Sequence, residues 1–219
     1  MNTLYNRIAG QSVERLAALS DGIFAVGMTL LAIDLRLPAA EFVHSEHDLL
    51  HALALIAPQV LIYLMSFLTL GIFWVGQQSQ LNHLKRSNVR LTWIHLILLF
   101  AVTLMPLSTK FLAEFVRYRT ALLAYWLNIV VLGLMLYIGW AYATRTNLIK
   151  DDLPLATTSA ICNRILIAQT LYAFGATLCI FSTYWSIAAI VVLQLNYVIA
   201  PGFRDLVNRR MCSGSTGLY

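Results

Sequence analysis

The stretch of sequence that decides the fold runs from Arg15 to Arg36 and reads RLAALSDGIFAVGMTLLAIDLR. Two carboxylates, Asp21 and Asp34, bracket an uncharged run and would lie about 20 Å apart along a helix axis. A charge inside a membrane helix is costly unless it faces a partner or water. The stretch therefore predicts a membrane helix whose polar groups are concentrated towards its ends.

The composition of the whole chain supports a lipid environment. Hydrophobic residues make up 59% of the 219 positions, charged residues make up 11%, and the mean hydropathy is +0.73. A soluble domain of this size carries about 25% charged residues. We expect no separate signal peptide, because residues 1–14 lack an apolar segment followed by a small-residue cleavage site.

Six apolar runs approach the roughly 20 residues that a membrane-crossing helix needs. They fall at residues 16–36, 52–76, 92–113, 121–143, 163–182 and 185–203. The last two runs are so close in sequence that they must form a tight helical hairpin. The predicted fold class is therefore an all-α integral membrane protein, a single domain over residues 1–219 with six transmembrane helices per subunit.

The basic residues predict the orientation of these helices, because cytoplasmic loops collect Lys and Arg. With the N-terminus inside, eleven of the fifteen Lys and Arg residues lie on the inner side and four on the outer side. We therefore expect a multi-pass protein of the cell membrane with both termini in the cytoplasm. The same bias accounts for the net charge of +5, so no nucleic-acid partner is expected.

An aliphatic stripe runs along the predicted first helix. Val26, Leu30 and Ile33 recur at spacings of four and three and so share one helix face, with Thr29 beside them. Most such stripes pack against other helices, and a pore-lining stripe is the alternative. No second copy of this helix occurs in the chain, so a pore built from several copies needs several subunits.

The two acids of the first helix have several possible roles. Asp21, next to Ser20, suggests a buried polar network, with either Arg15 or a neighbouring helix as its partner. Asp34 lies either at the lipid interface or at the outer mouth of a pore, where it would attract cations.

The start of this helix resembles the bacterial branch of the transmembrane-protein-175 family, the lysosomal potassium channel family. Arg15, Ser20 and Asp21 match the Arg-x-x-x-Phe-Ser-Asp motif of that family, and Leu19 stands in place of the usual Phe. This motif is the specific part of the resemblance.

Weaker similarity continues along the second and third predicted helices. Trp74 resembles the family's residue near the end of the second helix, and Gln77 and Gln78 stand about where bacterial members often have His. His95 stands where Asn is common in the third helix.

The resemblance implies a homotetramer embedded in membrane lipid, with a pore lined by the first helix of each subunit. It implies a potassium-preferring cation channel that conducts passively and passes Na⁺ more weakly, with K⁺ as the permeant ion. Apolar constrictions of this kind gate by dewetting. The implied constriction residues are Val26, Thr29, Leu30 and Ile33. The implied structural polar clamp is Arg15, Ser20 and Asp21, with Asp34 at the outer mouth.

A secondary transporter coupled to protons or sodium is the alternative function, with the charges of the first helix as its coupling site. The lack of an internal repeat argues against it, since many transporters have one. No clustered nucleophile and base, HExxH motif or phosphate loop occurs, so we expect neither an enzyme nor a bound cofactor.

The remaining polar residues suggest smaller roles. His44, His47 and His51 have helical spacing, which fits either a solvated loop or a zinc or proton site. The three cysteines form no CxxC pair, so no metal site or disulfide framework is expected from them. Four amides within the predicted spans are expected to hydrogen-bond between helices: Asn128, Gln169, Gln194 and Asn196.

Overall fold

The computed structural model describes residues 12–33, 35, 44–180 and 182–197, and the regular elements of this part are helices. In chain order they are α2 (Val13–Ile33), α3 (Glu46–Asn82), α4 (Val89–Thr103), α5 (Met105–Glu114), α6 (Arg119–Arg145), α7 (Leu155–Thr177), one 3₁₀ turn (Leu178–Ile180) and a last helix over residues 183–197. Because α4 and α5 together occupy one predicted run, the expectation of six helices is confirmed.

Four of these segments are long and apolar enough to cross a membrane, namely α2, α3, the combined segment Val89–Glu114, and α6. The prediction of six spans is therefore supported only in part. Helix α7 begins at Leu155 rather than at residue 163 and carries Asn163 and Arg164 within it, which reduces its apolar character. The last helix begins at residue 183, and the final residues of its predicted span, 198–203, lie outside the described part.

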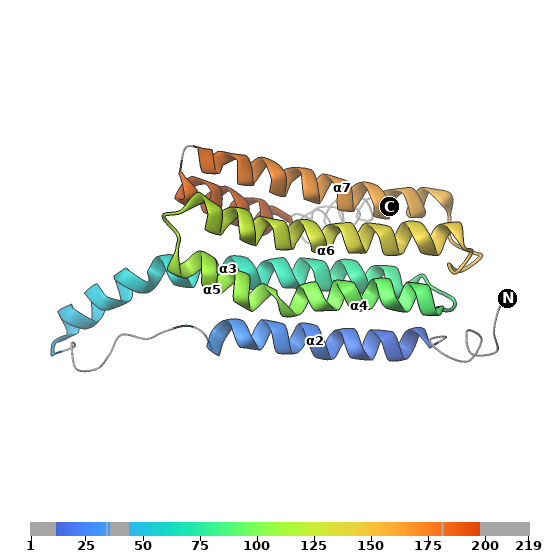
Figure 1. Ribbon diagram of the computed structural model, residues 1–219, viewed down its shortest axis with the longest axis horizontal. Coiled ribbons are helices and arrows are strands. Elements are labelled where there is room, and N and C mark those ends of the chain that lie inside the picture. Colours follow the sequence, from blue (N-terminus) through green and yellow to red (C-terminus); the bar gives the residue numbers. More distant parts are fainter. Residues whose placement is uncertain (1–11, 34, 36–43, 181, 198–219) are drawn as a thin grey trace, which may run out of the picture.

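Helix α3 is longer at both ends than the predicted span of 52–76. Its 37 residues correspond to about 55 Å at 1.5 Å per residue, well beyond a hydrocarbon core of about 30 Å. The Ser45 hydroxyl caps the start by accepting a hydrogen bond from the Asp48 N–H at 3.1 Å. The first turns of α3 consequently extend past the rest of the bundle (Figure 1).

The predicted third span, 92–113, is two helices that meet at Leu104. Pro106 stands in the first turn of α5, where its missing N–H does no harm, whereas inside a continuous helix it would remove a hydrogen bond. The break therefore follows from the sequence at this point.

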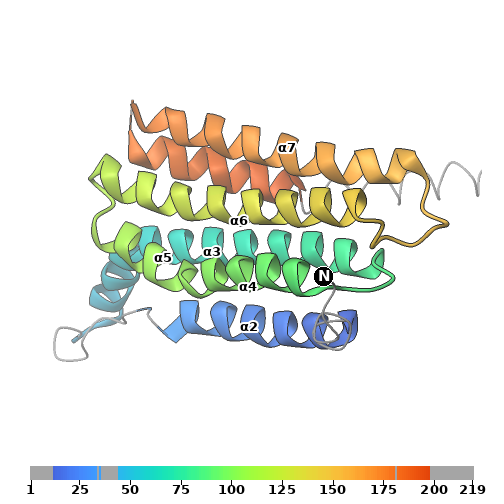
Figure 2. The same ribbon diagram turned by 45° about the vertical axis from the view of Figure 1, so that its right-hand side comes forward.

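The helices form a bundle with α2 at one edge and α7 at the opposite edge, and both views of the ribbon agree on this order (Figures 1 and 2). Helix α2 packs on α3, α4 and α5, while α6 packs on α3, α4, α5 and α7. The largest apolar cluster includes Phe24 of α2, Leu70 of α3, Val102 of α4 and Leu132 of α6. The edge position of α2 leaves one of its sides uncovered by its own subunit.

A network of neutral polar side chains crosses the middle of the bundle. The hydroxyl of the fully buried Tyr125 accepts a hydrogen bond from Ser66 at 3.3 Å and pairs with Thr69 at 3.2 Å. Gln194 of the last helix donates to Thr69 at 2.7 Å, and Thr109 of α5 donates to Ser66 at 2.8 Å. Hydrogen bonds of this kind join membrane helices, so the network ties the last helix to α3, α5 and α6.

Three of the four predicted interhelical amides make such bonds. Gln194 does so in this network, Asn128 donates to Ser108 at 3.3 Å, and Gln169 donates to the Ile129 carbonyl at 3.4 Å. Asn196 is exposed on the last helix, so its predicted role has no support in the described part.

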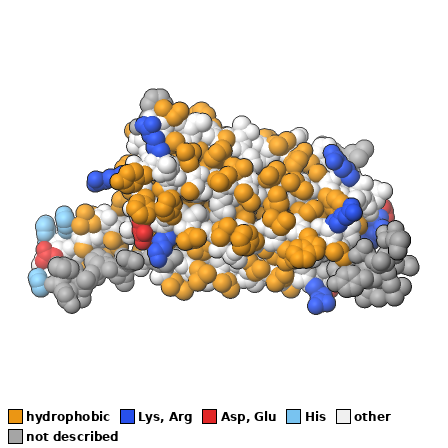
Figure 3. Space-filling view, in the orientation of Figure 1, with side chains coloured by type: hydrophobic (Ala, Val, Ile, Leu, Met, Phe, Trp, Pro, Cys, Tyr) orange, Lys and Arg blue, Asp and Glu red, His pale blue; other side chains and the backbone are white. Residues whose placement is uncertain are grey.

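The outer surface matches a membrane environment. Hydrophobic side chains cover the middle of the face seen in Figure 3, and Lys and Arg gather towards both ends. The α3–α4 and α6–α7 connections meet at one end, which we call the turn end. There Leu84 pairs with Ile149 in an antiparallel bridge, and Lys85 contacts Asp151 at 2.6 Å.

The hairpin between α7 and the last helix depends on a close approach at Gly175. A Cβ atom at this position would lie 2.8 Å from Cγ1 of the fully buried Ile190, and Ser186 donates to the Gly175 carbonyl at 2.6 Å. Overpacking of a core costs about 1–3 kcal/mol. We therefore expect Gly175→Ala to lower the midpoint of thermal unfolding of the purified protein in detergent.

Gly71→Ala is the matched control, because a Cβ at Gly71 meets nothing within 4 Å. Equal midpoints for the two variants would contradict the close-approach explanation.

Candidate functional site: the exposed face of the first helix

Helix α2 contacts its own subunit along one face. Its buried residues are Leu16, Ser20, Phe24, Gly27 and Leu31, which follow one another at spacings of three or four. This is the pattern of an amphipathic helix with one packed side. Every residue of the predicted aliphatic stripe is absent from this buried set, so the stripe lies elsewhere on the helix.

The stripe residues are exposed on the isolated subunit. The exposed fractions are 56% for Val26, 42% for Leu30 and 76% for Ile33, and Thr29 is exposed beside them. The Thr29 hydroxyl donates to the Val26 carbonyl at 2.8 Å. Its proton is thus engaged within the helix, and its oxygen remains available to accept a hydrogen bond or to face a cation.

An open groove of about 690 Å³ adjoins this face. It is lined by small and aliphatic residues of α2, including Ala18, Gly22 and Val26, together with Thr103 of α4. A Cβ atom at Gly22 would meet nothing within 4 Å. The subunit therefore leaves room along α2 for a second helix to approach closely, as small residues permit in membranes.

The polar start of α2 is fastened to α3 through Ser20. Ser20 is fully buried, and its hydroxyl donates to the Leu16 carbonyl at 2.8 Å. The amide nitrogen of Gln77 on α3 donates to Ser20 Oγ at 3.0 Å and also lies 3.2 Å from His95 Nδ1 on α4. This buried amide thus connects three helices, while its oxygen has no hydrogen-bond partner among the described residues.

Asp21 is bound to the same helix α3 but at its surface. Its Oδ1 accepts a hydrogen bond from Trp74 Nε1 at 2.8 Å and another from the Gln78 amide. Hydrogen bonds to a charged acceptor are stronger than neutral ones. The prediction of a polar network around Asp21 is correct, whereas the prediction that this network is buried is wrong for the isolated subunit, because Asp21 is exposed.

Arg15 does not take part in this network. Its side chain is exposed. Among the described residues the ion pair joins Lys85 to Asp151, so Arg15 has no acidic partner there. Of the two partners considered for Asp21, the neighbouring helix is therefore the one observed. The role of Arg15 as a third member of a clamp stays a prediction.

The other candidate residues do not add to the site. Asp34 lies outside the described residues. His44 donates its backbone N–H to Asp48 Oδ2 at 3.3 Å, while His47 and His51 lie in the first turns of α3. No group of three or more His, Cys, Asp or Glu residues within the described ranges could hold a metal ion, so the zinc alternative has no support there.

Sequence reasoning noted Trp74, Gln77 and Gln78 individually but missed that they hold the first helix. The signal was present in their spacing, because positions i, i+3 and i+4 share one helix face. A tryptophan and two amides on one face of a membrane helix need acceptors, and Ser20 and Asp21 are the polar residues that supply them.

Together, the fold and the site define a multi-helix membrane protein whose first helix is anchored by its polar start and presents an uncovered apolar face. The model of the family described as "Endosomal/lysosomal potassium channel TMEM175" matches residues 15–106, which include this anchor. A potassium channel of Streptomyces collinus is 32% identical over 190 residues, covering 84% of this chain and 90% of the relative.

Two further comparisons agree. A potassium channel of Chamaesiphon minutus is 26% identical over 192 residues, covering 84% of this chain and 93% of the relative. The crystal structure of a lysosomal potassium-selective channel TMEM175 homolog from Chamaesiphon minutus superposes with a TM-score of 0.74 at 24% identity, covering 86% of this chain and 97% of that chain. The chain belongs to the TMEM175 family and is embedded in a membrane.

The expectation that the chain is not an enzyme is also confirmed, because the relatives it matches are channels.

The anchor generates a stability prediction. Ser20→Ala removes the acceptor of a buried amide hydrogen, and an unsatisfied buried polar group costs about 1–3 kcal/mol. We expect this variant to unfold at a lower temperature than the unmodified protein in the same detergent.

Thr170→Val is the control, since Thr170 is exposed and its hydroxyl bonds only to Leu166 within its own helix. A Ser20→Ala variant as stable as this control would show that the Ser20–Gln77 bond does not hold α2 in place.

Proposed function

We propose that this chain forms a potassium-preferring cation channel that conducts passively through a constriction built from α2. The single observation that carries the proposal is the uncovered face of α2, with Val26, Leu30 and Ile33 exposed on the subunit. In a family whose relatives are potassium channels, a pore between subunits accounts for an apolar face that its own subunit leaves uncovered.

The proposed assembly is a homotetramer, in which four copies of α2 surround one axis. The groove beside Ala18 and Gly22 gives a neighbouring helix room to approach. We further propose that the channel lies in the cell membrane with both termini in the cytoplasm, because the basic residues are concentrated on that side.

The proposed constriction consists of stacked aliphatic rings with one hydroxyl layer. Such rings hinder permeation by excluding water, and K⁺ loses its hydration shell more readily than Na⁺. The Thr29 oxygen, with its proton engaged by Val26, would offer a passing cation an acceptor in each subunit. Ser20 and Asp21 would act as anchors of the pore helix rather than as ion ligands, because Ser20 Oγ and Asp21 Oδ1 accept hydrogen bonds from side chains of α3.

Substitution of the constriction tests this function. Val26→Ala and Leu30→Ser each widen or wet the proposed neck, so we expect faster cation flux and a potassium-to-sodium flux ratio closer to one. A barrier lowered by about 1.4 kcal/mol would raise the flux roughly tenfold. The measurement is potassium and sodium flux from liposomes containing the purified protein.

Val192→Ala and Leu166→Ser are matched controls, because these side chains are similarly exposed, at 64% and 50%, but lie on the last helix and α7. The constriction assignment fails if all four variants keep the flux and selectivity of the unmodified protein.

The secondary-transporter alternative gives a different result in the same liposomes. A channel passes potassium down its own gradient with no second ion gradient present. A coupled transporter would require a proton or sodium gradient, and it would lose transport in Asp21→Asn while remaining assembled.

The proposed subunit arrangement has its own test. In a background where Cys162, Cys179 and Cys212 are replaced by Ser, we expect Val26→Cys to form disulfide-linked dimers on mild oxidation, because copies of α2 approach one another around the axis. The readout is electrophoresis without reducing agent, and Val192→Cys is the control. Crosslinking at Val192 but not at Val26 would place a different helix at the subunit interface.

A further inference from the structure

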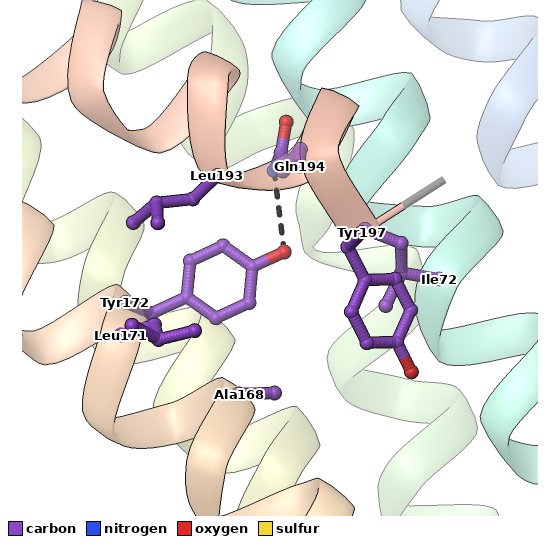
Figure 4. Close-up of a pocket in the computed structure, with 7 residues that line it drawn as sticks. All are labelled: Ile72, Ala168, Leu171, Tyr172, Leu193, Gln194 and Tyr197. Carbon is purple, nitrogen blue, oxygen red and sulfur yellow. Dashed lines mark hydrogen bonds between the residues drawn. The ribbon is translucent and has the colours of Figure 1, made fainter. Parts of the chain in front are cut away.

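A cavity between α3, α7 and the last helix plays no part in the proposed pore. It is a partly open groove with an empty volume of about 530 Å³, a figure that includes the space at its open side. A second hollow, with an empty volume of about 290 Å³, shares Ile72, Ala168, Tyr172 and Tyr197 with it, so the two adjoin. Figure 4 shows this shared part, with Tyr172 of α7 on one side and Tyr197 of the last helix on the other.

The walls of the cavity are mostly apolar. Ile161 and Tyr172 mark its two ends along α7, which corresponds to a length of about 17 Å at 1.5 Å per residue. Leu136 of α6 and Ile72 of α3 line the other sides. A cavity of this length and lining, within the helix bundle of a membrane protein, suits a hydrocarbon chain.

One end of the cavity is basic. Arg164 lines it together with Ser79 and Gln80, which belong to the last turn of α3, so this end lies towards the turn end of the bundle. The guanidinium carbon of Arg164 lies 4.8 Å from the centroid of the Tyr197 ring, and Arg164 Nε donates to the Tyr197 hydroxyl. Tyr197 thereby holds the guanidinium in place.

The charge of Arg164 is not neutralised by the described protein. Its side chain is exposed, and the ion pair found in the described part joins Lys85 and Asp151 instead. A guanidinium has five N–H donors, and the bond to Tyr197 uses only the one on Nε. The two terminal nitrogens make no hydrogen bond to the residues that the structure describes, and they could bind a phosphate through two parallel hydrogen bonds.

We propose that this cavity binds an anionic membrane phospholipid, with an acyl chain between α3, α7 and the last helix and the headgroup phosphate on Arg164. Basic pockets between transmembrane helices are suited to such headgroups, and Arg90, Arg145 and Lys150 at or near the turn end add attraction for an anionic surface. The lipid would connect α7 and the last helix to α3, on the side of the subunit away from α2.

The test compares lipids with identical acyl chains, phosphatidylglycerol and phosphatidylcholine, bound to the purified full-length protein and measured by native mass spectrometry. We expect preferential binding of phosphatidylglycerol. Arg164→Gln should weaken that binding roughly tenfold or more, as expected for the loss of charge-assisted hydrogen bonds. Ala168→Phe, which fills the cavity, should weaken the binding of both lipids.

Arg145→Gln is the matched control, because Arg145 is also an exposed arginine near the turn end but does not line the cavity. Equal losses in Arg145→Gln and Arg164→Gln would attribute the preference to diffuse surface charge and overturn the site. Competition by inorganic phosphate at the lipid's own concentration would identify a free-anion site and overturn the lipid assignment.

Two outcomes keep the test decisive if Arg164→Gln does not fold. Arg164→Lys retains the charge but loses the planar fork, so a reduced preference supports the bidentate contact and an unchanged preference contradicts it. Unchanged binding of both lipids by Ala168→Phe overturns the placement of the acyl chain. None of these measurements depends on ion flux, so they stand apart from the proposed pore.

Discussion

The buried amide of Gln77 is the interaction on which the placement of the first helix depends. Its nitrogen donates a hydrogen bond to Ser20 on α2 and lies 3.2 Å from His95 Nδ1 on α4. A buried polar group of this kind stabilises the structure only while its partners remain in position, since losing one leaves a costly unpaired donor. The amide therefore fixes the register of α2 against two helices at once.

The rest of the first helix is shaped by this one-sided attachment. Asp21 accepts two further hydrogen bonds from the same helix α3. Beyond it, α2 is held by apolar packing of Phe24 and Leu31 in the main hydrophobic cluster. One side of α2 packs against its own subunit, and the other side is exposed on the isolated subunit. The assembly proposed above, in which several subunits meet at α2, would give that free side a role that a single subunit does not supply.

Much of this arrangement could be predicted from the sequence, because hydropathy and motif are local properties. The apolar runs located the helices. The motif of Arg15, Ser20 and Asp21 singled out α2, the helix with the uncovered apolar face. The partners of Asp21 could not be chosen by spacing alone, since Arg15 and a neighbouring helix were both within reach. Hydropathy merged α4 and α5 into one run, although Pro106 marks the place where the helix is interrupted. The early start of α7 at Leu155 was missed, because hydropathy does not register where a helix begins.

The polar network around Tyr125 has an electrical consequence. Its members Ser66, Thr69, Thr109 and Gln194 are joined by hydroxyl and amide groups, none of which carries a formal charge. A transmembrane potential does work only on charge that moves, about 2.3 kcal/mol per elementary charge for each 100 mV. A rearrangement of these side chains would therefore transfer almost no gating charge across the membrane. The membrane potential would do almost no work on this network.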